Sequence, residues 1–245
     1  MLEDLQMPRK SPFALVASMS LGCNNVKISA NLSYVVCDNM QNLSLVNRTF
    51  IVQALEFSLR KRANVSLNVA RVLVSQVDAE ELEAALEEFN TKIVNSSLIS
   101  HNWKEVILRA LWDERLRNED RFNETEFVTA WFQRRLRLFI SAISTDMLQC
   151  LHNETMQCDQ YQAIVKGLDA EFTKMSLSVQ TDILHSFQIP YLKGLDSDDS
   201  SLRCYSSNAS FSAFLEESLQ SFGDLLTLRD LETLVPTSKL HKFKC

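Results

Sequence analysis

Apolar side chains recur with the spacing of an α-helix across residues 123–151. On a helix of 3.6 residues per turn, one stripe carries Phe132, Leu136, Phe139, Ile140 and Ile143. Further apolar residues widen this stripe, namely Phe127, Trp131 and Leu138. The remaining strip is narrow and polar and consists of Gln133, Arg134, Arg137 and Ser141. The pattern predicts two consecutive helices with packed neighbours on two sides.

The same apolar pattern returns 83 residues later, across residues 206–234. The paired positions are Trp131 with Phe214, Phe132 with Leu215, Leu136 with Leu219, Phe139 with Phe222, Ile143 with Leu226, Leu148 with Leu231 and Leu151 with Leu234. Any two amphipathic helices agree in part by chance, but this agreement extends through a following short helix and favours a repeat. The polar strips differ in charge, because the second copy has Glu217, Gln220 and Asp224 in place of Arg134, Arg137 and Ser141.

Further stretches show helical periodicity on both sides of this segment. They cover residues 45–61, 65–74, 77–94, 103–117, 159–175 and 179–187. Asp78 and Glu81 stand at the spacing of a capping box at the start of the third stretch. The last stretch is expected to end before Pro190, whose ring and missing N–H oppose a continuing helix.

Composition narrows the fold class. The chain of 245 residues contains only 4 Gly and 4 Pro, fewer turn residues than a sheet protein of this size needs. We therefore expect an all-α chain with short connections. The net charge of −6 and the dispersed basic residues argue against nucleic-acid binding. No stretch reaches the roughly 18 apolar residues of a membrane span, so no transmembrane segment is expected.

The expected domain organisation is simple. Residues 1–22 are either a signal peptide or a buried N-terminal helix, because a short apolar run follows Arg9 and Lys10. Residues 23–245 are expected to form one helical-repeat domain with sub-units 23–120, 121–200 and 201–245. The acidic loop 195–201 marks an internal boundary, and it lacks the pattern of a calcium-binding loop.

Asparagine placement indicates the cellular compartment. Eight N-x-S/T sequons occur, at Asn31, Asn42, Asn47, Asn64, Asn95, Asn123, Asn153 and Asn208. Random placement of the Asn, Ser and Thr residues predicts only roughly two such sequons. Some of these hydroxyl residues could serve as helix caps instead, as Thr125 and Ser210 are placed to do. The excess nevertheless predicts passage through a secretory pathway and N-glycosylation.

Cysteine usage points to the same compartment. Six cysteines occur without a C-x-x-C pair, which favours disulfides over zinc or redox chemistry: Cys23, Cys37, Cys150, Cys158, Cys204 and Cys245. The sequence does not choose among the possible pairings. Proximity favours a bond between Cys150 and Cys158 and another between Cys23 and Cys37, which leaves Cys204 with Cys245.

Motifs for catalysis or cofactor binding are absent from the sequence. It contains no nucleophile elbow, no zinc-protease motif and no glycine-rich phosphate loop. The histidines lie far apart, at His101, His152, His185 and His241. A thiol site at Cys150, near His152 and Asp146, is conceivable, but a bridged cysteine is favoured. We therefore expect no catalytic, cofactor-binding or metal-binding residues.

Arg135 is unusual because it falls inside the apolar arc of the central helix. Its guanidinium could reach water along a groove. Alternatively, it could pair with a glutamate such as Glu126 or one from a neighbouring repeat. Both interpretations remain open at this point.

The C-terminal copy has a set of apolar residues and a proline at Phe211, Phe214, Leu215, Leu219, Phe222, Leu228, Leu231, Leu234 and Pro236, matched less closely by Phe132, Leu136, Phe139, Leu148 and Leu151. With these residues the copy resembles units of the mesothelin, stereocilin and otoancorin superfamily. The resemblance covers roughly residues 120–240. It implies an extracellular glycoprotein built as an armadillo-like superhelical stack of short helices, acting in adhesion. Members are commonly membrane-anchored, whereas this sequence shows no anchor signal.

These observations predict a non-enzymatic, secreted or cell-surface glycoprotein module for extracellular adhesion or protein recognition. The expected partner is an extracellular protein or a cell-surface or matrix glycoprotein, with self-association as a further option. The alternative is a soluble secreted helical carrier of a ligand, or a signalling ligand. An enzyme ranks third.

Overall fold

The computed structural model describes residues 48–60, 65–75, 77–93, 99–117, 119–151, 156–194, 202–205 and 210–234. These residues form helices and turns and include no strand, which confirms the all-α class. The chain divides into two compact units, Met1–Ala85 and Leu86–Cys245. The predicted sub-units at 23–120, 121–200 and 201–245 remain predictions, and residues 1–22 lie outside the described residues.

The first unit contains α3 (Arg48–Arg60), α4 (Leu67–Ser75) and the beginning of α5 (Ala79–Lys92). Asp78 caps α5 by accepting a hydrogen bond from the Glu80 N–H at 2.9 Å. The predicted partner Glu81 does not face back to the cap, because its carboxylate accepts the Arg48 N–H at 2.8 Å. The buried apolar side chains of this unit include Ile51, Val52, Ala54, Leu55, Ala70, Leu73, Val74, Leu82 and Ala85.

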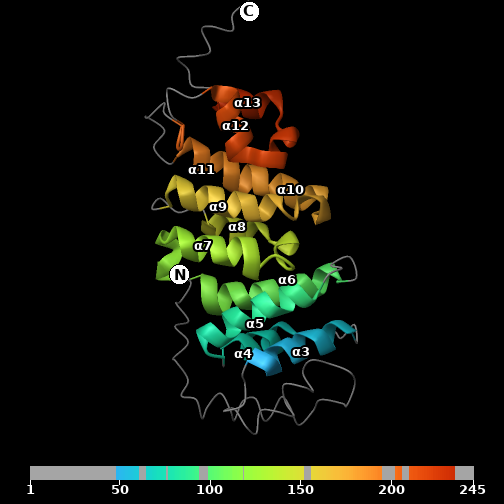
Figure 1. The fold of residues 1–245 in the computed structure, drawn as a ribbon. Coiled ribbons are helices and arrows are strands. Elements are labelled where there is room, and N and C mark those ends of the chain that lie inside the picture. The colour runs from blue at the N-terminus through green and yellow to red at the C-terminus, as the bar shows by residue number, and fades with distance from the viewer. Residues whose placement is uncertain are drawn as a thin grey trace, which may run out of the picture. The chain divides into compact units, whose positions relative to one another are not determined.

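The second unit contains the end of α5 and eight further α-helices among its described residues (Figure 1). They are α6 (His101–Leu111), α7 (Thr125–Ala130), α8 (Thr145–Leu151), α9 (Cys158–Asp169), α10 (Leu177–Ile183), α11 (Ile189–Lys193), α12 (Phe211–Leu219) and α13 (Leu228–Leu234). Helices α7, α9 and α12 contact one another in series. Helix α8 contacts α10. Helix α11 follows α10 after one wide turn and contacts α13. The unit therefore has two rows of short helices.

One local structure occurs three times in this unit. Each copy has a helix, a 3-10 turn, a Ser or Thr and a second helix. The 3-10 turns are Ile140–Ala142, Phe172–Lys174 and Gln220–Leu225. The second helices begin at Thr145, Leu177 and Leu228, so the later copies lie 32 and 83 residues after the first. The copy at 83 residues is the one predicted, and the copy at 32 residues was not.

The entry into the second helix of the last two copies has a physical cause. Ser176 accepts the Val179 N–H at 3.4 Å, and Thr227 accepts the Asp230 N–H at 3.2 Å. These bonds satisfy backbone donors that the first helical turn leaves without partners. The preceding residues, Ile143 and Met175 in the first two copies, are buried and fix the direction in which the chain enters.

The central segment follows the predicted pattern of burial but not a single regular helix. Every residue of the predicted stripe is buried, as are Phe127, Trp131 and Leu138. After α7 the chain widens into a π-helical turn, Trp131–Arg135, in which the Leu136 N–H donates to the Trp131 carbonyl at 2.9 Å. The 3-10 turn Ile140–Ala142 then reverses the chain. This altered path buries Ser141, which the helical pattern assigned to the exposed strip.

The predicted helix end before Pro190 is wrong. A π-helical turn, Leu184–Gln188, follows α10 and leads directly into α11, where Pro190 lies in the first turn. The first turn of an α-helix is the position where proline is most often found. Helix α11 ends instead at Gly194, whose φ of 74° suits a residue without a Cβ atom.

Candidate functional site

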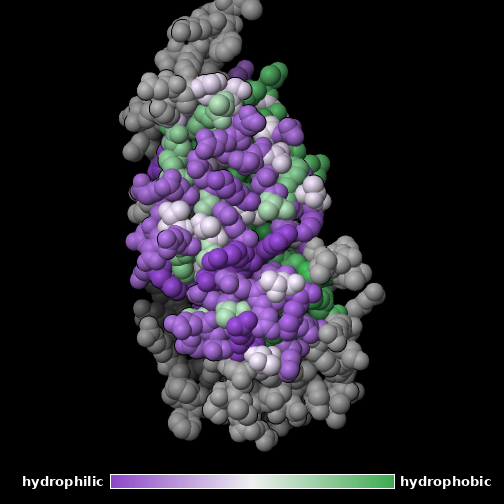
Figure 2. Space-filling view, in the orientation of Figure 1, coloured by the Kyte–Doolittle hydropathy of each residue, from purple (hydrophilic) through white to green (hydrophobic). Residues whose placement is uncertain are grey.

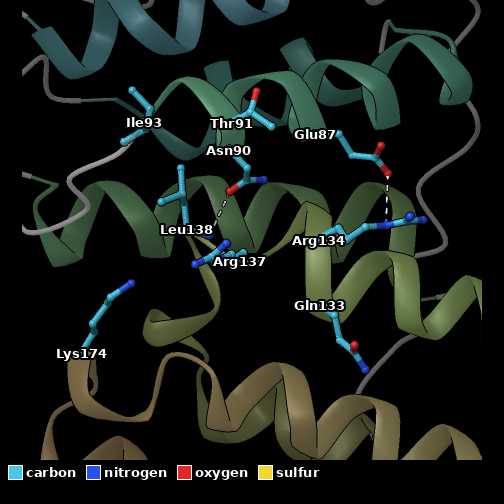
Figure 3. Close-up of a pocket in the computed structure, with 9 residues that line it drawn as sticks. All are labelled: Glu87, Asn90, Thr91, Ile93, Gln133, Arg134, Arg137, Leu138 and Lys174. Carbon is cyan, nitrogen blue, oxygen red and sulfur yellow. Dashed lines mark hydrogen bonds and ion pairs between the residues drawn. The ribbon is translucent and has the colours of Figure 1, made fainter.

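A cleft of about 580 Å³ opens in the second unit between the end of α5, the π-helical turn after α7 and the 3-10 turn after α9. Figure 3 shows the side chains that surround it. Its lining includes three cationic residues, Arg134, Arg137 and Lys174, and one carboxylate, Glu87. The other lining residues are Asn90, Thr91, Ile93, Gln133 and Leu138. The predicted arginine strip therefore forms one wall of the cleft.

Asn90 fixes the backbone of this wall. Its Nδ2 donates to the carbonyl oxygens of Leu86 and Arg135, each at 2.8 Å. Its Oδ1 accepts the Leu138 N–H at 3.2 Å. One amide thus serves three backbone groups around a turn whose own hydrogen bonding is irregular, so we expect it to hold Arg134 and Arg137 in place. On the other side, Gln133 Nε2 donates to the Ala163 carbonyl at 3.1 Å and ties the wall to α9.

Arg135 lies behind the cleft and pairs with a glutamate from another helix. Its Nε lies 3.1 Å from Glu87 Oε1, and its guanidinium lies 5.4 Å from the centre of the Trp131 ring. With 13% of its side chain exposed, Arg135 is held by an ion pair and an aromatic face. This agrees with the ion-pair interpretation, although the partner is Glu87 of α5 and not Glu126. Arg134 Nε lies 3.8 Å from the same Glu87 oxygen, at the outer edge of an ion pair.

Glu171 forms ion pairs with two cations of the cleft, and it was not identified from the sequence. Only 1% of its side chain is exposed, yet Lys174 Nζ lies 2.7 Å from Oε2 and Arg137 Nε lies 3.5 Å from Oε1. Among the described residues Oε2 has no aligned hydrogen-bond donor, so its contact with Lys174 is chiefly electrostatic. A comparison at an offset of 32 residues could have revealed it, because Glu171 occupies the position of Phe139 in the first copy and Phe222 in the third.

A buried lysine lies close to this carboxylate. Lys104 of α6 donates from Nζ to Ser141 Oγ at 3.0 Å, and both side chains are buried. Burial lowers the pKa of Lys104, while the charge of Glu171 opposes this shift and that of Lys174 adds to it. A lysine beside a serine resembles a catalytic pair, but the Ser141 hydroxyl is buried away from solvent. The contact ties α6 to the 3-10 turn of the first copy.

The predicted disulfide pairing is wrong where the described residues test it. Cys158 is bonded to Cys204, whereas Cys150 is a free, exposed cysteine at the end of α8. Sequence proximity misled because residues 202–205 return to the start of α9. The Arg203 N–H donates to the Leu192 carbonyl at 2.9 Å and helps to hold this return. The remaining candidates, Cys23, Cys37 and Cys245, lie outside the described residues.

Of the sequons, Asn123 is described and its side chain is exposed at the end of a 3-10 turn, Asp120–Asn123. The other seven asparagines lie outside the described residues: Asn31, Asn42, Asn47, Asn64, Asn95, Asn153 and Asn208. The predicted cap positions differ in outcome. Glu124, and not Thr125, occupies the N-cap position of α7, whereas Ser210 does occupy that position before α12. Neither side chain makes a capping bond.

The described part of the chain contains neither a membrane-spanning helix nor a cluster of metal ligands. Within it, no helix is both long and apolar enough to cross a bilayer. The same residues contain no group of three or more His, Cys, Asp or Glu side chains arranged to hold a metal ion. Of the four histidines, His101 and His185 are exposed, and His152 and His241 lie outside the described residues.

Comparison of the whole chain with models of protein families, with curated proteins and with solved structures finds no match.

Proposed function

We propose that the chain is a non-enzymatic, secreted or cell-surface glycoprotein module that acts in extracellular adhesion or protein recognition. The observation that carries this proposal is the arrangement of the second unit, where three copies of one helix pair stand in two rows with an open charged cleft on the side. Rows of stacked helix pairs expose extended lateral surfaces, and proteins of this kind use such surfaces for binding. An armadillo-like stack is the architecture that we propose for the chain.

Three features support the extracellular part of the proposal. The first is the excess of sequons, and the second is the exposed position of Asn123. The third is the Cys158–Cys204 disulfide, because such bonds persist mainly in oxidising compartments. The resemblance of the C-terminal copy to the mesothelin superfamily points the same way.

The surface favours recognition over the carriage of an apolar ligand. Figure 2 shows mainly hydrophilic side chains over the visible face of the described helices. The cleft is lined by charged and amide side chains, with Ile93 and Leu138 as its larger apolar members. A lipid carrier needs a predominantly apolar cavity, whereas this cleft suits polar and ionic contacts.

Two measurements test the proposal. The endogenous protein is immunopurified, and glycan occupancy at the eight sequons is mapped by mass spectrometry. Beads coated with the glycosylated protein are then tested for attachment to cells, with albumin-coated beads as the control. We expect most sequons to be occupied, Asn123 among them, and the coated beads to attach. Empty sequons would refute the extracellular assignment, and a lack of attachment to every cell type tested would refute the adhesion role.

A further inference from the structure

The cations of the cleft outnumber the carboxylates that face them. Glu87 lies closest to Arg135, whose side chain is 13% exposed, and its Oε1 lies 3.8 Å from Arg134 Nε. Glu171 is shared between Lys174 and Arg137. The side chains of Arg134 and Arg137 are each 63% exposed and that of Lys174 is 40% exposed. The cleft therefore presents surplus positive charge to solvent.

A buried carboxylate, that of Glu171, also positions two of these cations. A buried carboxylate is strongly desolvated, and its ion pairs must offset that penalty. The equivalent residues in the other copies, Phe139 and Phe222, are buried apolar side chains that carry no such cost. Glu171 draws Arg137 and Lys174 toward one point although they come from different turns of the chain. Figure 3 shows both side chains extending into the space between α5 and the turn that carries Lys174.

The shape and charge of the site limit the kind of ligand that fits. A volume of about 580 Å³ lies within the range of pockets that hold a small ligand or a few side chains. Guanidinium groups bind carboxylates through two parallel hydrogen bonds. The apolar contacts at Ile93 and Leu138 suit aliphatic side chains beside those carboxylates.

The net charge of the whole chain disfavours long anionic ligands more than short ones. At a net charge of −6 the protein repels an extended polyanion along most of its length. A short acidic segment responds mainly to the charges within a Debye length, about 8 Å at physiological salt. Local positive charge in a globally acidic protein therefore favours a short acidic peptide over a sulfated polysaccharide.

We propose that the cleft binds a short acidic segment of a protein partner, whose Asp or Glu carboxylates pair with Arg134, Arg137 and Lys174. This inference rests on the proposed function, because it names the partner chemistry of a recognition module. Arg134 and Arg137 supply the bidentate contacts, and Lys174 supplies a point charge on the facing side. Asn90 and Glu171 are positioning residues that hold these cations.

Binding is measured by fluorescence anisotropy on the full glycosylated chain. The probe is a short peptide of alternating Glu and Leu with blocked ends, and the reference is the same peptide with Gln in place of Glu. The double variant R134E/R137E removes the two guanidinium groups. The control R229E/K166E makes the same change in net charge at exposed positions that do not line the cleft. Circular dichroism verifies that both variants remain folded.

We expect the Glu peptide to bind at least about tenfold more tightly than the Gln peptide, a difference of one decade in Kd. R134E/R137E should abolish this preference, and the control should retain it. A carbodiimide should join a peptide carboxylate to the Lys174 amine as an amide, which mass spectrometry locates. Equal binding of the two peptides, or a preference that survives in R134E/R137E, would overturn the proposal.

A heparin oligosaccharide is titrated in parallel. If it binds through the same arginines while the Glu peptide does not, the ligand class is sulfated glycan and the proposal is wrong. The cell-attachment assay separates this outcome from a failure of the proposed function. If the Glu peptide fails to bind but coated beads still attach, recognition uses another surface.

Discussion

The first and second copies of the helix pair, α7 with α8 and α9 with α10, share the order of helix, 3-10 turn, Ser or Thr and helix, but differ at the buried residue that precedes the 3-10 turn. In the first copy Phe139 packs 6.1 Å from the ring of Phe89 and 5.7 Å from that of Trp103. In the second copy the same position carries Glu171, surrounded by the charges of Arg137, Lys174 and Lys104. One scaffold thus accepts either an aromatic cluster or a charged cluster. The charged cluster is the one that lies beside the cleft.

The copies differ at a second position, where their first helices meet. The first copy has Arg135, whose side chain extends to Glu87. The second has Gly167, which faces the backbone of Phe132 in the first copy. The position that carries a long side chain in one copy must be bare in the other, because α9 packs directly against the π-helical turn Trp131–Arg135.

Adding one methyl group at Gly167 should produce the largest loss of stability. A Cβ atom there would lie 2.5 Å from the Phe132 carbonyl oxygen and 2.7 Å from its carbonyl carbon, both backbone atoms that cannot move independently. We expect G167A to lower the free energy of unfolding by about 3 kcal/mol, as overpacking of a rigid site does. Urea unfolding followed by circular dichroism measures this loss.

Gly223 provides the matched control. A Cβ atom at Gly223 would lie 3.7 Å from the Leu219 Cβ, an ordinary contact. G223A should therefore change stability by less than about 1 kcal/mol, with a gain as the expected sign, since alanine restricts the unfolded chain. Equal losses in G167A and G223A would show that the copies are not in close backbone contact at Gly167.

Replacing Glu171 by leucine tests the charged cluster and should have the second largest effect. The change leaves the buried Lys104 without its nearby opposing charge, whereas Arg137 and Lys174 can turn to water. We expect a loss of about 2 kcal/mol, less than the loss on breaking a fully buried ion pair. Urea unfolding of the variant measures it, with E216L at an exposed site of α12 as the control.

A double-mutant cycle distinguishes a charge effect from a packing effect. In K104M/E171L both charges are replaced, so the double variant should be more stable than the sum of the single losses predicts, by about 1 kcal/mol. Strict additivity would show that Lys104 and Glu171 do not interact.

The sequence predicted the class of the fold and the identity of the buried residues more accurately than the path of the chain. Periodicity reports which face of a segment avoids water, so the stripe from Phe132 to Ile143 was predicted correctly even though the helix is broken there. The π-helical turns were not predicted, because a period of 3.6 residues describes a regular α-helix and does not mark where a single turn widens.

The second copy was missed for a related reason. The second copy keeps Leu168, Met175 and Ile183 at the positions of Leu136, Ile143 and Leu151, but Glu171 and Gly167 interrupt the apolar pattern. Residues chosen for a charged site or a close backbone approach weaken the signal of the repeat that contains them. The cleft has the same origin, since sequence placed Arg134 and Arg137 together but gave no reason to bring Lys174 beside them.

The smallest expected change in stability comes from residues at the start of the second helices, and this change depends on pH. In the second copy Ser176 binds a backbone N–H, whereas in the first Ser144 donates to Asp146 Oδ1 at 2.6 Å. Arg109 Nη2 donates to the same carboxylate oxygen at 2.9 Å. The hydrogen bonds from Arg109 hold the pKa of Asp146 well below its usual range.

A carboxylate with a lowered folded-state pKa stabilises the protein above its unfolded pKa, near 4, and loses this effect as the pH falls toward the folded value. Because 62% of the Asp146 side chain is exposed, we expect D146N to cost no more than about 1 kcal/mol at neutral pH. The difference from the parent protein should shrink steadily below about pH 4. Urea unfolding from pH 7 to pH 2 measures it, with D224N at an exposed carboxylate of the third copy as the control. A difference that stays constant with pH would mean that Asp146 acts through helix capping geometry and not through its charge.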